Sequence, residues 1–317
     1  MRLLRLRISE RKTLPSIEFM IKSTIIVILW ATPPLVSKIW VGIEASFPAF
    51  FFGFLRYLLG FITLSVILVT KGKLRIIIEI GVSKIREISI CSSWLVLMII
   101  GQNLSVTYIL GSSSSILLNF NPVFVYLIAP VMFRDEEYSF RKTLAVILSS
   151  FGIILVFLAA SDLLTTDPGE FFLGNLLGLL SGVAWAGYSL SLKKLFRNTS
   201  SEEVTTLNLM VAALLLLLLS LLFEEIPSSS IFSIESIAGL VLIGVGAAAI
   251  AFTLYLQLIQ TYGAIKAANI QFLIPLVSIL FAWIFLAEFS LLALFGGILC
   301  AIGVALVTYS SNGEREE

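Results

Sequence analysis

Arg56 is the clearest case of a charged side chain deep inside a long apolar run, which spans residues 45–70. It lies about ten residues from the outer end of that run, a depth of roughly 15 Å on a helix. A guanidinium inside a bilayer faces a cavity or a partner, because burying it alone is costly. No carboxylate lies at matching depth in another run. We therefore expect Arg56 either to bond backbone carbonyls or to bind an anionic group such as an amino-acid carboxylate.

Prolines interrupt several apolar runs, and each proline removes a hydrogen bond and frees the carbonyl four residues back. The hinge or kink candidates are Pro33, Pro34, Pro122 and Pro275. In a membrane, a freed carbonyl needs a neighbour, a side chain or a water-lined cavity. The carbonyls of Leu118 and Gln271 are freed by the last two prolines, and their similar placement favours a central cavity.

Polar and aromatic side chains gather near these prolines. The candidate substrate-binding residues, besides Arg56, are Trp30, Asn103, Asn119, Trp185, Tyr188, Gln257, Asn269 and Gln271. Each alone is explained by an interhelical hydrogen bond worth about 0.6 kcal/mol. Together they are enough to line an uncharged, partly aromatic pocket.

The composition removes most kinds of catalytic and metal chemistry. The 317 residues include no histidine and two cysteines, Cys91 and Cys300. We expect no histidine-based triad, no Cys/His metal cluster and no disulfide framework, and predict a protein that is not an enzyme and has no cofactor. With 58% hydrophobic and 13% charged residues, the chain is too apolar for a soluble domain. Its net charge of +1 is too small to attract nucleic acid electrostatically.

Ten apolar runs are long enough to carry these residues across a membrane, since about 20 apolar residues span a core of about 30 Å. The runs are 18–40, 45–70, 93–110, 113–133, 143–160, 171–193, 204–223, 237–262, 265–287 and 291–309. A count of nine stays open, because two divisions are weak. Only Gly111 and four serines divide the third run from the fourth, and only Tyr262, Gly263 and Lys266 divide the eighth from the ninth.

Basic residues favour ten spans with both termini in the cytoplasm of a cell membrane. Nearly all of the 21 Lys and Arg residues fall in the tails and alternate loops that ten spans place on one side, and basic loops stay cytoplasmic. The first run lacks a cleavage site and is too long for a signal peptide, so we expect a retained helix. The basic segment 71–92 has two open interpretations, a segment lying on the membrane surface or a solvated loop.

The chain contains an internal repeat. A slide of 151 residues aligns Glu137 with Glu288 and Gly152 with Gly303, and a slide of 155 aligns Trp30 with Trp185. Each copy holds five runs, an odd number, so the second copy must enter the membrane from the other side. We therefore predict an all-α membrane protein of ten transmembrane helices in two inverted five-helix repeats, a construction typical of secondary transporters. Because no Asp or Glu lies at depth, we expect export or exchange driven by the substrate gradient rather than by protons.

The paired motifs resemble those of the EamA family in the drug/metabolite transporter superfamily. The matching residues are Trp30-Ala31, Trp185-Ala186, Arg56-Tyr57, Pro122 with Glu137, and Pro275 with Glu288. Alanine replaces the family's glycine in both tryptophan pairs, and prolines interrupt the first helix. The resemblance covers nearly the whole chain and implies two EamA repeats that export or exchange small metabolites such as amino acids.

The expected organisation is a cytoplasmic tail (1–17), a first EamA-like repeat (18–160), a second repeat (161–310) and a second cytoplasmic tail (311–317). Expected partners are a small-molecule substrate and the lipid bilayer. Formation of a homodimer is left open, because small residues recur at every fourth position along the last run and allow close helix packing. The alternatives are a nucleotide-sugar or sugar-phosphate exchanger, which would need several buried basic residues, a lipid-handling membrane protein without transport, and an intramembrane enzyme.

Overall fold

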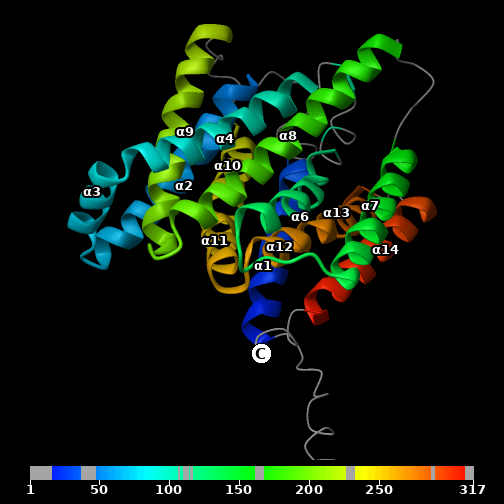
Figure 1. The fold of residues 1–317 in the computed structure, drawn as a ribbon. Coiled ribbons are helices and arrows are strands. Elements are labelled where there is room, and N and C mark those ends of the chain that lie inside the picture. Colours follow the sequence, from blue (N-terminus) through cyan, green and yellow to red (C-terminus); the bar gives the residue numbers. More distant parts are fainter. Residues whose placement is uncertain are drawn as a thin grey trace, which may run out of the picture.

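The computed structural model describes residues 16–36, 48–105, 108–109, 114, 117–160, 168–225, 233–286 and 290–310, and these form a bundle of helices with no strand among them (Figure 1). The first half contains α1 (Ile17–Val36), α2 (Ala49–Thr70), α3 (Leu74–Ser83), α4 (Ile85–Ser105), α6 (Asn121–Met132) and α7 (Phe140–Ala160). The second half contains α8 (Pro168–Leu195), α9 (Ser201–Phe223), α10 (Ile234–Val241), the π-helix η3 (Leu242–Ile250), α11 (Ala251–Tyr262), α12 (Ala264–Asn269), the 3₁₀-helix η4 (Ile270–Leu273), α13 (Ile274–Leu286) and α14 (Leu291–Ser310).

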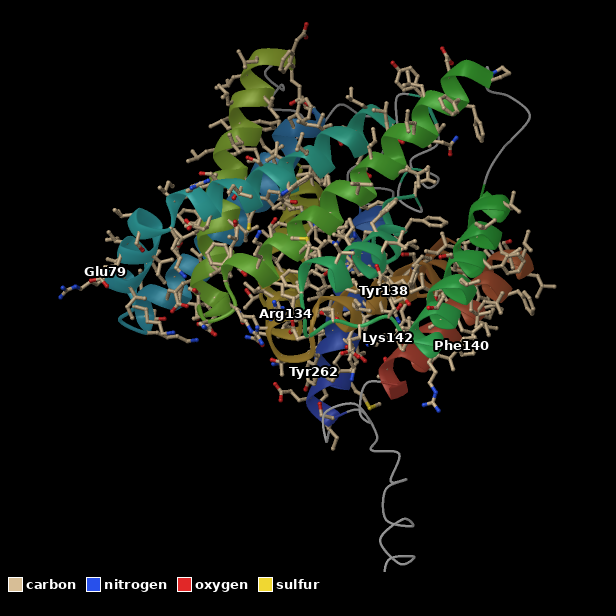
Figure 2. All side chains as sticks on the ribbon, in the orientation of Figure 1. Glu79, Arg134, Tyr138, Phe140, Lys142 and Tyr262 are labelled. Atoms are coloured by element: carbon tan, nitrogen blue, oxygen red, sulfur yellow. The ribbon has the colours of Figure 1, made fainter. Side chains whose placement is uncertain are left out.

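Seven helical stretches within the described residues are long and apolar enough to cross a membrane, and α6 is a shorter apolar helix. Large apolar side chains cover the outside of the bundle, as on α7, where Phe140, Ile147 and Phe151 are all exposed. Phe140 lies at the start of this helix (Figure 2). An exterior this apolar is stable against lipid and not against water. The chain is a multi-pass helical membrane protein, and the seven stretches are fewer than the ten spans predicted.

Several helix boundaries differ from the apolar runs. The basic segment 71–92 is mostly helical, with α3 followed by α4, which begins at Ile85 rather than at residue 93. Helix α6 begins at Asn121 rather than at residue 113, and Pro122 fits its first turn because an N–H is not needed there. The division predicted near Gly263 is a true helix end, since its φ of +88° lies in the left-handed region that glycine adopts at low cost.

Helices α2 and α9, one from each half, pack side by side and antiparallel. Gly53 near the start of α2 faces Leu216, and Gly60 farther along faces Leu209. The sequence numbers rise along one helix as they fall along the other, so the two helices run in opposite directions.

Helices α7 and α14 form a second antiparallel pair between the halves (Figure 1). Ser149 and Cys300 bond each other's backbone carbonyl oxygens, at 3.4 Å in both directions. A Cβ on Gly152 or on Gly296 would lie 2.5 Å from the carbonyl oxygen of the other residue. Only glycine allows the two backbones to approach so closely, which is how small residues stabilise helix pairs in a membrane.

Small residues also recur at every fourth position of α8, and they pack against other parts of the same chain. Gly174 faces Ile109, and Gly178 faces Leu117. On α14, Gly297 faces Leu276 of α13. These glycines therefore pack helices of one chain against each other.

Candidate functional site

An aromatic cluster forms where helices of both halves meet. The ring of Trp30 on α1 lies 5.4 Å from the ring of Trp185 on α8 and 5.1 Å from that of Tyr255 on α11, both edge to face. Phe252 lies 5.5 Å from Trp185, and Tyr188 lies 5.4 Å from Trp185. Edge-to-face and offset arrangements are the favoured geometries of aromatic pairs. Three of these five residues, Trp30, Trp185 and Tyr188, were predicted from the sequence.

The π-helix η3 contacts this cluster. The indole N–H of Trp30 donates to the carbonyl of Ala247, at 3.0 Å, in the middle of η3. π-Helical turns are rare in proteins and occur often at functional sites. The bond ties α1 of the first half to η3 of the second half beside the aromatic rings.

A chain of hydrogen bonds crosses the cluster from α6 to α8. The Asn121 amide donates to Gln271 Oε1 at 3.1 Å, and Gln271 Nε2 donates to the Tyr255 hydroxyl at 3.0 Å. That hydroxyl lies 2.8 Å from Ser189 Oγ, which donates to the carbonyl of Trp185 at 3.1 Å. Since the Tyr255 hydroxyl accepts from the amide, it can donate to Ser189, and the whole chain has one consistent direction.

Pro122 and Pro275 stand at equivalent breaks in the two halves. Pro122 is the second residue of α6, and Pro275 is the second residue of α13, directly after the 3₁₀ turn η4. The carbonyl of Leu118 accepts a bond from the Asn121 side chain at 3.1 Å, and that of Gln271 accepts from the backbone N–H of Ile274 in the 3₁₀ turn. Side chain and tightened turn thus satisfy the carbonyls that the prolines free.

The prolines of α1 act differently. Pro33 and Pro34 lie within α1, which continues to Val36. The carbonyl of Leu29, which Pro33 frees, accepts a bond from the Thr32 hydroxyl at 2.7 Å. A local side chain therefore compensates the missing helix bond.

Arg56 lies on α2 beside η3, about 10 Å along the helix from its first residue. Its backbone carbonyl oxygen lies against Gly244 of η3. Its guanidinium lies 5.7 Å from the ring of Tyr57, and its Nε is buried without a hydrogen-bond partner. Among the described residues, no carboxylate pairs with it.

Asn103, Gln257 and Asn269 were also predicted, and within the described residues none of the three forms a hydrogen bond with the aromatic cluster. Asn269 is 1% exposed, and both atoms of its amide have no hydrogen-bond partner there. The amide nitrogen of Asn103 is also buried without a partner. Gln257 is partly buried on α11, and Asn119 lies in the turn before α6. Buried amides with open bonding capacity are rare and indicate groups that a ligand or water can satisfy.

Three central residues escaped the sequence analysis. Asn121 directly precedes Pro122, a position that could have marked it as a partner for the freed carbonyl. Phe252 and Tyr255 are two of many aromatic residues in apolar runs, and no spacing distinguishes them. Only the packing of α11 against α1 and α8 brings them to the centre.

A cluster of charges lies at the end of the bundle that carries the loop between α6 and α7. Lys193 Nζ of α8 lies 2.6 Å from Glu136 and 3.1 Å from Asp135. Glu136 also accepts the backbone N–H of Ala264, at 2.6 Å, at the start of α12. Burial raises the pKa of Asp135, but the hydrogen bond and charge of Lys193 and the charge of Arg197 outweigh it and leave this pKa below its ordinary value. A cavity of about 580 Å³ opens beside the cluster.

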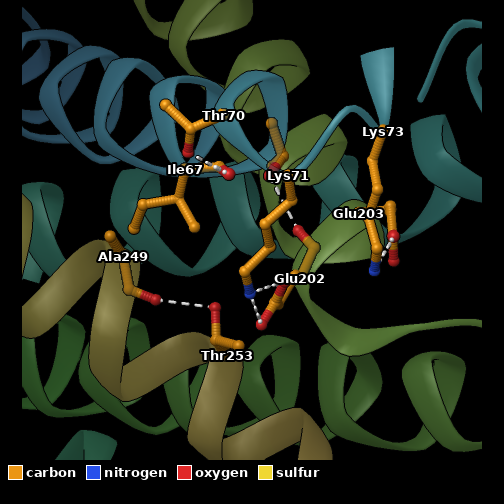
Figure 3. Close-up of polar contacts among 9 residues, drawn as sticks. Ile67, Thr70, Lys71, Lys73, Glu202, Glu203, Ala249 and Thr253 are labelled. Carbon is orange, nitrogen blue, oxygen red and sulfur yellow. Dashed lines mark hydrogen bonds and ion pairs between the residues drawn. The ribbon is translucent and has the colours of Figure 1, made fainter. Parts of the chain in front are cut away.

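Ion pairs also join the turn between α2 and α3 to α9 (Figure 3). Lys71 Nζ lies 2.9 Å from the Glu202 carboxylate, and Lys73 Nζ lies 2.9 Å from Glu203. The hydrogen bond and charge of Glu203 raise the pKa of Lys73 above its ordinary value.

At the other end of the contact between α2 and α9, Glu224 accepts the backbone N–H groups of Phe50 and Phe51, at 2.6 and 2.9 Å. The carboxylate thus satisfies orphan donors at the start of α2, where negative charge also complements the helix dipole.

An apolar helical bundle that buries polar and aromatic side chains between its helices is typical of a multi-pass membrane protein. Residues 172–309 match the family model of the EamA-like transporter family, which confirms the resemblance found in the sequence. In this part of the sequence the chain is similar to membrane transporters of that family.

The chain is similar to curated relatives along most of its length. It is 22% identical to the uncharacterized transporter YoaV of Bacillus subtilis, over 92% of this chain and 96% of the relative. It is 25% identical to the uncharacterized transporter YvbV of the same organism, over 96% of each chain. A solved crystal structure with 16% identity superposes with a TM-score of 0.74, over 93% of this chain and 98% of that chain. That likeness shows the fold.

Proposed function

We propose that the chain is a secondary transporter that exports or exchanges small metabolites, amino acids or related compounds, by alternating access around the central cluster. In this proposal residues 18–160 and 161–310 are two inverted five-helix repeats, and both termini are cytoplasmic in a cell membrane. Each repeat supplies one wall of the substrate path, and rocking of one repeat against the other exposes the centre to either side.

The observation that carries the proposal is that equivalent residues of the two repeats touch each other. Trp30 and Trp185, aligned by the slide of 155, have ring centroids 5.4 Å apart. Ser149 and Cys300, aligned by the slide of 151, exchange reciprocal hydrogen bonds. Contacts between equivalent residues arise at a two-fold axis, because residues beside the axis meet their own symmetry mates.

The direction of the helices supports inversion of the repeats. Equivalent helices α2 and α9 pack antiparallel, as do α7 and α14. A two-fold axis that lies across the helices reverses their direction, whereas an axis along them would leave equivalent helices parallel. If α1, α6 and α7 also span the membrane, the seven stretches become the ten spans that two five-helix repeats require.

The central residues favour a small substrate with a carboxylate and an uncharged body. Aromatic rings and amides surround the centre, and no acidic residue contacts them among the described residues. The guanidinium of Arg56 lies near η3, and its buried Nε has no hydrogen-bond partner within the described residues. Guanidinium binds carboxylate through two parallel hydrogen bonds. We therefore assign Arg56 the carboxylate, and the aromatic cluster and the amides of Asn269 and Gln271 the rest of the substrate.

Counterflow into proteoliposomes loaded with unlabelled amino acids tests the function. We expect labelled amino acid to accumulate in loaded vesicles and not in empty ones, without an imposed pH gradient. A lipid-handling protein without transport would give no counterflow for any solute. Uptake that follows a pH gradient, and loses this dependence on one interior substitution, would contradict the gradient-driven mechanism.

A phosphorylated substrate is the second candidate, because the buried lysines Lys142, Lys193 and Lys266 line the cavity beside Glu136. Lys193 is already neutralised by Glu136, and Lys266 lies 4.8 Å over the ring of Phe19. Counterflow of a nucleotide-sugar or sugar phosphate, in place of amino acids, would favour this candidate.

A further inference from the structure

An apolar groove of about 410 Å³ lies between α2, α3, α4 and α9. Apart from Ser65, the residues that line it are apolar or glycine. Its floor includes Ile88 and Leu207, which are buried, and its rim includes Val82, which is 75% exposed. Gly81 of α3 faces Leu207, where a Cβ would reach van der Waals contact at 3.4 Å, so the groove is open because this position has no side chain.

Helix α3 has the properties of a segment at the membrane interface. Its ten residues expose Leu74, Ile76, Ile78 and Val82. Exposed aliphatic side chains on so short a helix are unfavourable in water but are buried by the headgroup and acyl boundary of a bilayer. This favours the membrane-surface interpretation of the segment over the solvated loop.

The charges around the groove leave two basic groups without a carboxylate. Lys71 and Lys73 pair with Glu202 and Glu203, and Arg75 pairs with Glu79. By contrast, Lys84 Nζ donates to the Thr199 hydroxyl at 2.7 Å and lies over the ring of Phe196. Arg86 is exposed and makes no ion pair or hydrogen bond within the described residues. Both lie beside Ile85, a residue of the groove.

We propose that this groove binds one acyl chain of an anionic phospholipid, whose headgroup is held by Lys84 and Arg86. At roughly 30 Å³ for a group the size of a water molecule, the groove holds about fourteen such groups, enough for one long acyl chain and not for two. Basic residues beside a membrane-surface helix attract anionic headgroups. Because the walls belong to α2 of the first half and α9 of the second, the bound lipid stabilises the contact between the halves.

Thermal unfolding of the detergent-purified protein with added phosphatidylglycerol or phosphatidylcholine of identical chains tests the proposal. We expect phosphatidylglycerol to raise the melting temperature by about 5 °C at a hundredfold excess over its Kd, and phosphatidylcholine to raise it less. Native mass spectrometry should retain one phosphatidylglycerol per chain. Equal shifts with the two lipids in the wild type would overturn the anionic preference.

Matched variants separate the groove from the rest of the lipid-facing surface. Ser65→Trp fills the groove and should abolish the lipid-dependent shift, whereas Ile62→Trp, exposed on the same helix outside the groove, should keep it. Gly81→Leu is a second filling variant if Ser65→Trp does not fold. A retained shift in a folded filling variant, or an equal loss in Ile62→Trp, would overturn the site.

The headgroup contact has its own control. Lys84→Gln with Arg86→Gln should remove the difference between the two lipids, while Arg141→Gln, another exposed basic residue, should preserve it. If Arg141→Gln removed the difference between the two lipids to the same degree, the effect would come from general surface charge. The assignment of the headgroup to Lys84 and Arg86 would then be overturned.

Discussion

Tyr255 holds the middle of the hydrogen-bond chain at the centre of the bundle. Its hydroxyl accepts from Gln271 and reaches Ser189, so it joins η4, α11 and α8 through a single oxygen. Membrane interiors offer few alternative partners, and a buried group that loses its partner bears the cost of its desolvation. The Tyr255 hydroxyl is therefore the group on which the continuity of this hydrogen-bond chain depends.

Tyr255→Phe should destabilise the protein by about 1–3 kcal/mol, because the buried Gln271 amide loses its acceptor. Tyr138→Phe is the matched control, since that exposed hydroxyl donates only to the carbonyl of Leu127 at 2.7 Å and its loss should cost less than about 0.5 kcal/mol. Denaturant or thermal unfolding in micelles measures both. Equal effects of the two substitutions would contradict a structural role for the hydrogen-bond chain through Tyr255.

Arg56→Gln should lose the thermal stabilisation given by amino-acid ligands and keep any given by organic cations, because only the carboxylate meets the guanidinium. Arg141→Gln, at an exposed position, is the control and should keep both. Thermal-shift titration of the purified variants measures the effect. Equal loss for acids and cations would assign Arg56 to structure and leave the transporter class intact.

Asp135 makes the stability of the folded protein depend on pH in the acid range. The pKa of Asp135 in the folded protein is lowered, below the unfolded value of about 3.9. Its contribution to the free energy of unfolding is therefore fully present above about pH 4. That contribution is lost as the pH falls through the pKa of the folded state. Wild type should therefore lose more stability than Asp135→Asn between about pH 5 and pH 2. Melting temperatures across this range measure the difference, and parallel curves would contradict it. Because Asp135 is 47% exposed, we expect a small effect.

At the scale of elements, the start of α12 depends on one glycine and one carboxylate. Gly263 has a positive φ, and a Cβ there would lie 2.7 Å from Glu136 Oε1, the oxygen that contacts Lys193 and the N–H of Ala264. The turn between α11 and α12 is therefore fixed by both conformation and packing.

Gly263→Ala should destabilise the protein more than Gly72→Ala. Both glycines have positive φ, which costs an alanine roughly 1–2 kcal/mol, but a Cβ on Gly72 meets nothing within 4 Å. The excess should disappear when Glu136→Ala is added, because the clash is then gone. The free energies of unfolding of Gly263→Ala, Gly72→Ala, Glu136→Ala and the Gly263→Ala/Glu136→Ala double variant measure this coupling. If the excess persisted in the double variant, contact with Glu136 would not be its cause.

Hydropathy predicted the existence of most helices better than their ends. Apolar runs identify helices because bilayer thickness sets their length, and the glycine at 263 was correctly read as a break. The start of α4 at Ile85 was missed because hydropathy cannot separate an amphipathic surface helix from the loop around it. The π-helix η3 was missed as well, since its Gly and Ala residues are equally compatible with an α-helix.

At the scale of the whole molecule, the sequence predicts a repeat but does not predict all of the side chains that meet between the two halves. The slides of 151 and 155 already aligned the residues that the structure brings into contact, Ser149 with Cys300 and Trp30 with Trp185. The Asn121 and Gln271 pair was missed because such contacts depend on the angle at which α6 meets η4, which no periodicity encodes.

The proposed inversion of the two repeats predicts opposite accessibility for equivalent residues. Phe140 and Leu291 begin the equivalent helices α7 and α14 and are 82% and 72% exposed. An impermeant maleimide should label Phe140→Cys only from the cytoplasmic side and Leu291→Cys only from the outside, with Arg75→Cys as a cytoplasmic marker. Background labelling should be low because the native cysteines are buried. Labelling of both positions from one side would mean that the repeats insert in parallel, and a parallel pair cannot exchange inward-open and outward-open shapes by swapping the roles of its halves.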